Sequence, residues 1–183
     1  MKTWLIALGI WCTSLTAAAA EFRLSSPDIA PGGTIANKFV YKGFGCSGEN
    51  VSPSLSWTGA PAGTRSFALL VHDADAPTGG AGWWHWLVYD IPAGAANLAQ
   101  GAGASDGAAL PSGSVQARTD FGSPGWGGPC PPVGHGVHHY RFTLYALKVE
   151  KLDVAEGATA SLIGYMVNAN ALGKANLLGL YGR

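Results

Sequence analysis

The run of residues 66–71 constrains the fold most strongly, because it is apolar throughout from Phe67 to Val71. A short apolar run of this kind is typical of a strand that is buried on both faces. Residues 140–147 follow a different pattern, in which apolar and more polar residues alternate. The apolar positions of that run are Phe142, Leu144 and Ala146. A period of two predicts a half-buried strand, so both runs favour a fold made mainly of β-strands.

Shorter apolar segments predict further strands. The chain has 27 glycines and 11 prolines, and both residue types punctuate short strands. The segments that they separate are residues 39–41, 55–57 and 86–89. Residues 95–114 are rich in Gly, Ala and Ser, so we expect a long surface excursion there rather than a linker between domains.

One helix is predicted near the end of the chain, over residues 158–172. Apolar side chains recur there at helical spacing. They are Leu162, Ile163, Tyr165, Met166 and Ala169. We expect Tyr165 and Met166 to contact the core, Asp153 or Thr159 to cap the start, and Gly173 to end the helix. Residues 175–180 fit a last short strand or a helical turn.

Residues 1–20 have the pattern of a secretory signal peptide. Lys2 supplies a positive charge, an apolar stretch follows over residues 4–15, and alanines precede Glu21. The apolar stretch is shorter than the roughly 20 residues that a membrane-spanning helix needs. We therefore predict cleavage before Glu21, a single domain over residues 21–183, no transmembrane segment after cleavage, and a periplasmic or secreted protein.

Charge and cysteine content further limit the class of protein that the sequence can encode. Removal of Lys2 lowers the 11 basic residues to 10, against 11 acidic residues, and no basic stripe is present. The sequence thus lacks the electrostatic footprint of nucleic-acid binding. Cys46 and Cys130 remain in the mature chain, and an even cysteine count in an exported protein favours a disulfide. A pair of buried free thiols is the alternative.

Two polar clusters stand next to the predicted strands. The first contains residues 72–77 and then Trp83-Trp84-His85-Trp86, and the second contains residues 127–132 and then His138-His139-Tyr140. Strands deliver polar side chains to the rim of a site in this way. The mixture of carboxylates, imidazoles, tryptophans and a Gly/Pro loop suggests one small pocket for an anion.

Each candidate in these clusters also has a structural explanation. Asp73, directly after the buried strand, is the better candidate for the pocket. For Asp75 we favour a structural role in a turn. His85 fits either the pocket or the core, and Trp83 could line a ligand site. The glycines of residues 127–128 could free backbone amides to face an anion, and the prolines after them lock the turn.

Other chemistries have less support in the sequence. No Gly-x-Ser-x-Gly turn exists for a serine hydrolase, and the glycines of residues 43–48 lead into no helix that could bind a nucleotide phosphate. Zinc bound by Asp73, His85 and His138 is chemically feasible, but their spacing matches no metal motif. We therefore predict no metal and no cofactor.

The chain resembles the phosphatidylethanolamine-binding protein family, and most closely its bacterial Raf kinase inhibitor-like branch. Residues 73–77 resemble the Asp-Pro-Asp-Ala-Pro signature, residues 83–86 the Trp-His-His-Phe-like segment, and residues 128–132 and 138–140 the Gly-Pro-Pro and His-Arg-Tyr segments. His139 replaces the usual arginine. The resemblance implies a large central antiparallel sheet, a smaller sheet and few helices. It also implies a ligand-binding pocket made by Asp73, Trp83, His85, Gly128, Pro131, His138 and Tyr140.

The leading hypothesis is a periplasmic, noncatalytic protein that binds a small anion, either phosphate or a phosphorylated head group. A protonated His85 or His138 would attract the anion, and Asp73 would orient an imidazole and favour its charged form. The second hypothesis is an acid–base hydrolase that uses Asp73 with His85 or His138. The third is an interaction module that meets a protein partner through residues 95–114 or exposed tryptophans.

Overall fold

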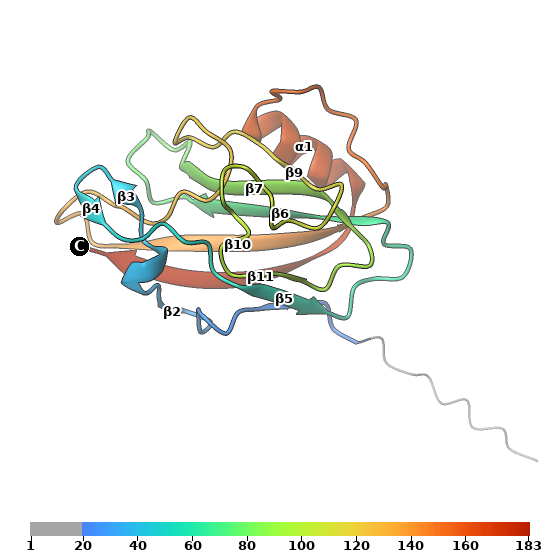
Figure 1. Ribbon diagram of the computed structural model, residues 1–183, viewed down its shortest axis with the longest axis horizontal. Coiled ribbons are helices and arrows are strands. Elements are labelled where there is room, and N and C mark those ends of the chain that lie inside the picture. Colours follow the sequence, from blue (N-terminus) through green and yellow to red (C-terminus); the bar gives the residue numbers. More distant parts are fainter. Residues whose placement is uncertain (1–19) are drawn as a thin grey trace, which may run out of the picture.

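The computed structural model describes residues 20–183, and a six-stranded sheet forms its centre (Figure 1). In spatial order its strands are β2 (Gly33–Thr34), β11 (Ala171–Gly182), β10 (Val137–Leu147), β6 (Ser66–Asp73), β7 (Trp83–Pro92) and β9 (Val115–Gln116). Neighbouring strands are antiparallel, except that β2 pairs parallel to β11. The mostly β fold is confirmed, and the sheet is mixed rather than purely antiparallel because of this short edge strand.

Two smaller sheets lie beside the central one. One has three antiparallel strands in the order β1 (Arg23–Ser25), β5 (Leu55–Thr58) and β8 (Asn97–Leu98). The other is the hairpin of β3 (Lys42–Gly43) and β4 (Cys46–Ser47). The strand predicted at residues 39–41 is wrong, because a 3₁₀ helix, η1 (Asn37–Phe39), occupies its start. Phe39, in η1, and Val40, which follows it, are buried without belonging to a sheet.

Strand β6 is buried on both faces, as predicted. Phe67, Leu69 and Val71 pack into the larger core cluster, which includes Leu55 and Trp57 of β5. Its alternate residues, Ala68 and Leu70, pack into a second cluster beneath the helix. Since side chains alternate along a strand, β6 supplies both cores at once. The molecule is therefore layered as small sheet, large sheet and helix.

The helix α1 (Ala160–Asn170) is shorter than predicted. Thr159 is its N-cap and accepts from the backbone N–H of Leu162, whereas the helix ends at Asn170 rather than near Gly173. The chain enters β11 directly at Ala171, so the strand predicted over residues 175–180 is much longer. Tyr165 is 70% exposed and is not a core residue, because Ile163 and Val167 form the buried face.

Residues 95–114 differ in part from the expected surface excursion. They contain β8, and Leu98 and Ala102 are fully buried in the larger core. The backbone N–H of Gly103 donates to the hydroxyl of Ser52, where an added Cβ would press against Trp126. The small residues of this segment are therefore used partly for close packing.

The predicted signal peptide, residues 1–20, lies outside the described residues except for Ala20. Within residues 20–183, no helix has the length and apolar character needed to cross a membrane.

The cap of α1 gives a prediction about stability. Thr159→Ala removes the side-chain acceptor of the Leu162 N–H, so the free energy of unfolding should fall by about 1 kcal/mol. Thr159→Ser keeps the hydroxyl and is the matched control. Urea denaturation of the three proteins measures the difference, and equal stability of the Ala variant and wild type would contradict the capping role.

Candidate functional site

The ends of three neighbouring strands bring the polar clusters of the sequence together. Asp73, the last residue of β6, pairs with Trp83 at the start of β7 and with Tyr140 near the start of β10. The residues opposite one another in a sheet share a face. His138 lies two positions from Tyr140 and therefore projects to that same face. The sheet register alone thus assembles one site from segments far apart in the sequence.

His85, two positions after Trp83, lies on this face at a β-bulge. In the pairing of β7 with β6, Trp84 lies opposite His72 and Trp86 lies opposite Val71, so His85 between them has no partner. A bulge of this kind redirects a side chain, and it allows His85 and Trp86 to break the usual alternation. His85 then lines the cavity while Trp86 enters the core.

The site contains a cavity of about 280 Å³. Its lining residues are Phe44, Asp73, Ala76, Pro77, Thr78, Trp83, His85, Phe121, Cys130, Pro131, Pro132 and His138. Five of the predicted site residues belong to this lining, namely Asp73, Trp83, His85, Pro131 and His138. Gly128 and Tyr140 do not. The walls are mostly apolar, and Asp73, His85 and His138 form what we call the polar floor.

Asp73 and His138 form a buried hydrogen-bonded pair. The Nδ1 of His138 lies 2.7 Å from Oδ2 of Asp73, and both side chains are almost fully buried. The other carboxylate oxygen, Oδ1, accepts from the backbone N–H of Asp75. A carboxylate can only accept, so the proton of this contact lies on Nδ1 of His138. Asp73 thereby fixes the orientation of the imidazole.

His135 extends this pair to the protein surface. Its Nδ1 lies 2.8 Å from Nε2 of His138, so both ring nitrogens of His138 have protein partners. His135 itself is exposed. His135 was not predicted as a site residue, because it stands three positions before His138 in a glycine-containing loop without an apolar pattern. It forms a hydrogen-bonded chain with Asp73 and His138.

His85 is neutral near pH 7, contrary to the expectation of a protonated imidazole. Burial lowers its pKa to about 4, although the hydrogen bond with the carbonyl of Gly127 and the charge of Asp73 oppose that change. Nδ1 lies 2.6 Å from this carbonyl oxygen and donates to it. Neutral imidazole carries one proton, so Nε2 is an acceptor and is the ring nitrogen left for a ligand.

Tyr140 lies directly behind the polar floor. Its ring meets that of His85 edge to face at 5.0 Å between centroids, and its hydroxyl has no hydrogen-bond partner among residues 20–183. The side chain is fully buried. Burial raises the pKa of its hydroxyl most, and the charge of Asp73 raises it further. Tyr140 therefore keeps its proton and remains a donor.

Gly128 does not offer a free amide, which corrects a second expectation. Its N–H donates to Oδ1 of Asn50, and the N–H of Gly127 donates to the carbonyl of His85. An added Cβ at Gly128 would clash with the carbonyl oxygen of Phe39. Glycine is therefore needed here for close backbone packing, and these two amides have protein partners already.

Asp75 and His139 form a pair outside the cavity. Oδ2 of Asp75 accepts from both the backbone N–H and Nδ1 of His139, each at 2.8 Å. The side-chain hydrogen bond from His139 is the main reason that the pKa of Asp75 is lowered. His139 stands where the family usually has arginine. Its pair with Asp75 links the loop after β6 to β10.

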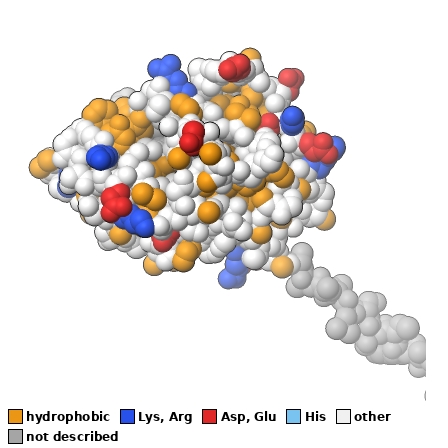
Figure 2. All heavy atoms as spheres, in the orientation of Figure 1, with side chains coloured by type: hydrophobic (Ala, Val, Ile, Leu, Met, Phe, Trp, Pro, Cys, Tyr) orange, Lys and Arg blue, Asp and Glu red, His pale blue; other side chains and the backbone are white. Residues whose placement is uncertain are grey.

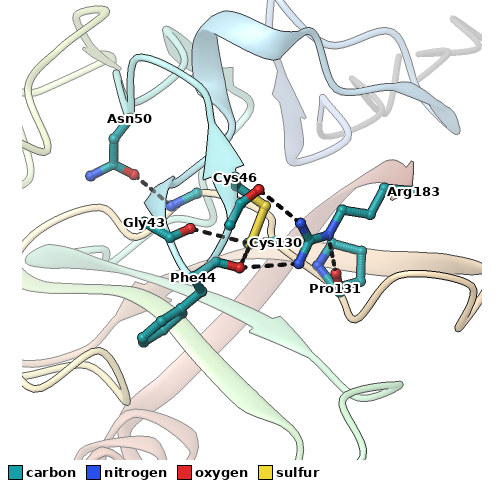
Figure 3. The surroundings of a disulfide bond; sticks show 9 residues. Gly43, Phe44, Cys46, Asn50, Cys130, Pro131 and Arg183 are labelled. Carbon is teal, nitrogen blue, oxygen red and sulfur yellow. Dashed lines mark hydrogen bonds between the residues drawn. A yellow bond between two sulfur atoms is a disulfide. The ribbon is translucent and has the colours of Figure 1, made fainter.

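The disulfide between Cys46 and Cys130 is present, as predicted (Figure 3). It joins the β3–β4 hairpin to the loop that carries Pro131, and Cys130 lines the cavity. Arg183 binds the same two segments, since its guanidinium donates to the carbonyl oxygens of Pro131, Gly45 and Phe44. Phe44 and Phe121 also line the cavity and were missed, because neither belongs to a strand or a motif.

Charge is sparse around the fold, and Figure 2 shows isolated charged side chains on the face that it presents. Orange side chains are scattered over the same face. Within the described residues, no three or more His, Cys, Asp or Glu side chains are grouped as a metal site.

A family model for phosphatidylethanolamine-binding proteins matches residues 25–182 of the chain. The chain belongs to the phosphatidylethanolamine-binding protein family. The resemblance stated from the sequence is thereby confirmed. The Escherichia coli protein YbcL is 47% identical over 181 residues, which cover 99% of this chain and 98% of YbcL. YbhB from the same organism is 43% identical over 159 residues, covering 87% of this chain and 99% of YbhB.

Structure comparison agrees with the family assignment. The crystal structure of YbcL matches with a TM-score of 0.86 at 49% identity, over 90% of this chain and 99% of that one. A relative from Mycobacterium tuberculosis, the putative lipoprotein LppC, is 38% identical over 169 residues, covering 92% of this chain and 76% of LppC.

The low pKa of His85 predicts a pH dependence of stability. Unfolded histidine binds a proton near pH 6.5, whereas folded His85 does so only at about 4, so stability should be lost as the pH falls between these values. The slope from this residue is up to about 1.4 kcal/mol per pH unit. His85→Gln should show a smaller decline, which urea denaturation between pH 7 and 4 measures. Equal slopes in both proteins would contradict burial of a neutral His85.

The disulfide gives a second stability prediction. Cys46→Ser with Cys130→Ser releases a loop whose ends are 84 residues apart, and the free energy of unfolding should fall by about 2–4 kcal/mol. Wild type kept in reductant is the control and should match the double variant. Unchanged stability in both would show that the bond does not stabilise the fold by constraining the unfolded chain.

Proposed function

We propose that this protein is a noncatalytic binding protein that holds a small phosphate-like acid in the cavity. The observation that carries the proposal is an unused hydrogen-bond acceptor in the cavity lining. Nε2 of neutral His85 can accept, because Nδ1 holds the proton that is donated to Gly127. A hydrogen phosphate group has an O–H that can donate to this nitrogen.

Asp73 sets the preferred charge of the ligand. Its buried carboxylate belongs to the polar floor, and a nearby negative charge disfavours a second one. A monoanion is therefore a better ligand than a dianion. The dianion of a phosphomonoester also lacks the proton that His85 accepts. Two independent effects thus favour the singly charged form.

We further propose that the mature protein is a single domain of residues 21–183 in the periplasm or outside the cell. Residues 1–20 have the signal pattern, and the Cys46–Cys130 bond is of a kind that persists in oxidising compartments. The relative LppC is named a putative lipoprotein, which also favours a location outside the cytoplasm. Protease protection of the full chain in intact and permeabilised cells tests this location.

Ligand binding should depend on the protonation state of the ligand. Methyl phosphate loses its second proton near pH 6, so its apparent affinity should fall on the order of 50-fold from pH 6 to pH 8 if only the monoanion binds. Dimethyl phosphate has no O–H and should bind more weakly than methyl phosphate at pH 6. Calorimetric titration measures both.

Two variants assign this effect to the cavity. His85→Leu removes the acceptor nitrogen and should lose the preference for methyl over dimethyl phosphate. His139→Gln is the matched control, because His139 is exposed and outside the cavity lining. Equal binding of methyl phosphate at pH 6 and pH 8 in wild type would contradict the proposed donor to His85.

Catalysis is tested separately from binding. Thr78 is the hydroxyl side chain of the cavity lining, and its Oγ1 donates to the carbonyl oxygens of Gly82 and Ala76 rather than to a side-chain base. We expect phosphodiesters and carboxylic esters to be recovered unchanged after incubation with the protein. A hydrolysis rate that His85→Ala abolishes would instead support the acid–base enzyme.

A further inference from the structure

The tip of the β3–β4 hairpin has an unusual residue for its backbone conformation. Phe44 and Gly45 form the two-residue turn between Gly43 and Cys46, and their φ angles are 52° and 78°. Turns of this kind favour Gly, Asn or Asp, because positive φ crowds a side chain. A bulky residue there is an outlier, and such strain is concentrated at functional sites.

The Phe44 side chain is placed at the cavity rather than in the core. It is 67% exposed and yet belongs to the cavity lining. Its ring lies 6.1 Å from that of Phe121 at an interplanar angle of 16°, and 5.3 Å from that of Tyr41. A single exposed apolar residue is ordinary. The combination of exposure, a strained backbone and a position on a cavity wall is what needs an explanation.

The backbone beneath Phe44 is held on both sides. The disulfide joins Cys46 to Cys130, and the guanidinium of Arg183 donates to the carbonyl oxygens of Phe44 and Gly45 at 3.2 and 3.0 Å (Figure 3). The same guanidinium reaches the carbonyl of Pro131 across the loops. The backbone that carries the aromatic ring is therefore held in place before any ligand arrives, which reduces the entropy cost of a contact with Phe44.

The cavity offers a ligand two different environments. Its polar floor is Asp73, His85 and His138, whereas Phe44, Trp83, Phe121 and Pro131 are apolar. The volume of about 280 Å³ suits a small molecule. A ligand that binds the floor through an acid group and carries an apolar group next to it would contact both environments.

We propose that Phe44 is a specificity-determining residue that selects phosphate-like acids with an attached apolar group, preferably an aromatic ring, over small phosphates. The inference rests on the proposed function, because the acid group must first bind the polar floor. Phe44 and Phe121 then stack on or beside the apolar substituent, and the hairpin acts as a fixed apolar lip of the cavity.

Phe44→Asn tests the inference, since asparagine tolerates positive φ and keeps the turn. Wild type should bind phenyl phosphate at least about threefold more tightly than methyl phosphate. The variant should lose about three- to tenfold in affinity for phenyl phosphate and keep its affinity for methyl phosphate. Val133→Asn is the matched control, because Val133 is 79% exposed and outside the cavity lining.

Thermal unfolding shows whether the variant is intact, and Phe44→Asn should melt at or above the wild-type temperature because the strain is relieved. Equal phenyl phosphate affinity in Phe44→Asn and wild type would overturn the role of Phe44. Parallel losses for both ligands would also overturn it, since they would mean that the hairpin only shapes the polar floor. If wild type binds neither ligand, the proposed function fails, and this inference fails with it.

Discussion

The register of β6 against its two neighbours determines where the polar groups of the site lie. Asp73 ends β6 opposite both Trp83 and Tyr140, which places all three side chains on one face of the sheet. A slip of one residue in either pairing would turn the opposing side chains to the other face. The alternating start of β10 opposes such a slip, because it would turn the exposed His139 and Arg141 into the core. The same packing that stabilises the sheet therefore positions the site.

Burial then decides the chemistry of each polar group, and it does so differently for the two histidines. His138 is buried with partners on both ring nitrogens, so its proton is directed by Asp73. His85 is equally buried but has only the Gly127 carbonyl, and loss of solvation keeps it neutral. Residue type alone gave these two side chains the same expected role. Because of their hydrogen-bond partners, His138 links Asp73 to His135, whereas His85 keeps a free acceptor nitrogen.

The sequence was most informative where a pattern depends on neighbours along the chain. The doubly buried β6, the strand β10 and the Thr159 cap follow from local sequence patterns, although Thr143 on the predicted polar face of β10 is buried. The polar clusters were predicted because they stand at strand ends. The errors arise from contacts between distant segments. Whether the Gly128 amide is free depends on Asn50, and whether Phe39 extends a strand depends on the loops around it. The bulge at His85 and the hairpin position of Phe44 have no periodic signal at all.

The unfavourable features of this structure are concentrated around one cavity. Phe44 has positive φ and an exposed ring, Tyr140 has a buried hydroxyl without a partner, and His85 is a titratable group without solvent. Each of these costs stability in the free protein. Elsewhere in the fold, α1 follows ordinary rules, with a capped start and a buried apolar stripe. A sheet buried on both faces, a disulfide and the Arg183 contacts can hold strained groups in place. Because the costs fall on groups that line or adjoin the same cavity, they are most simply explained by a ligand that offsets them on binding.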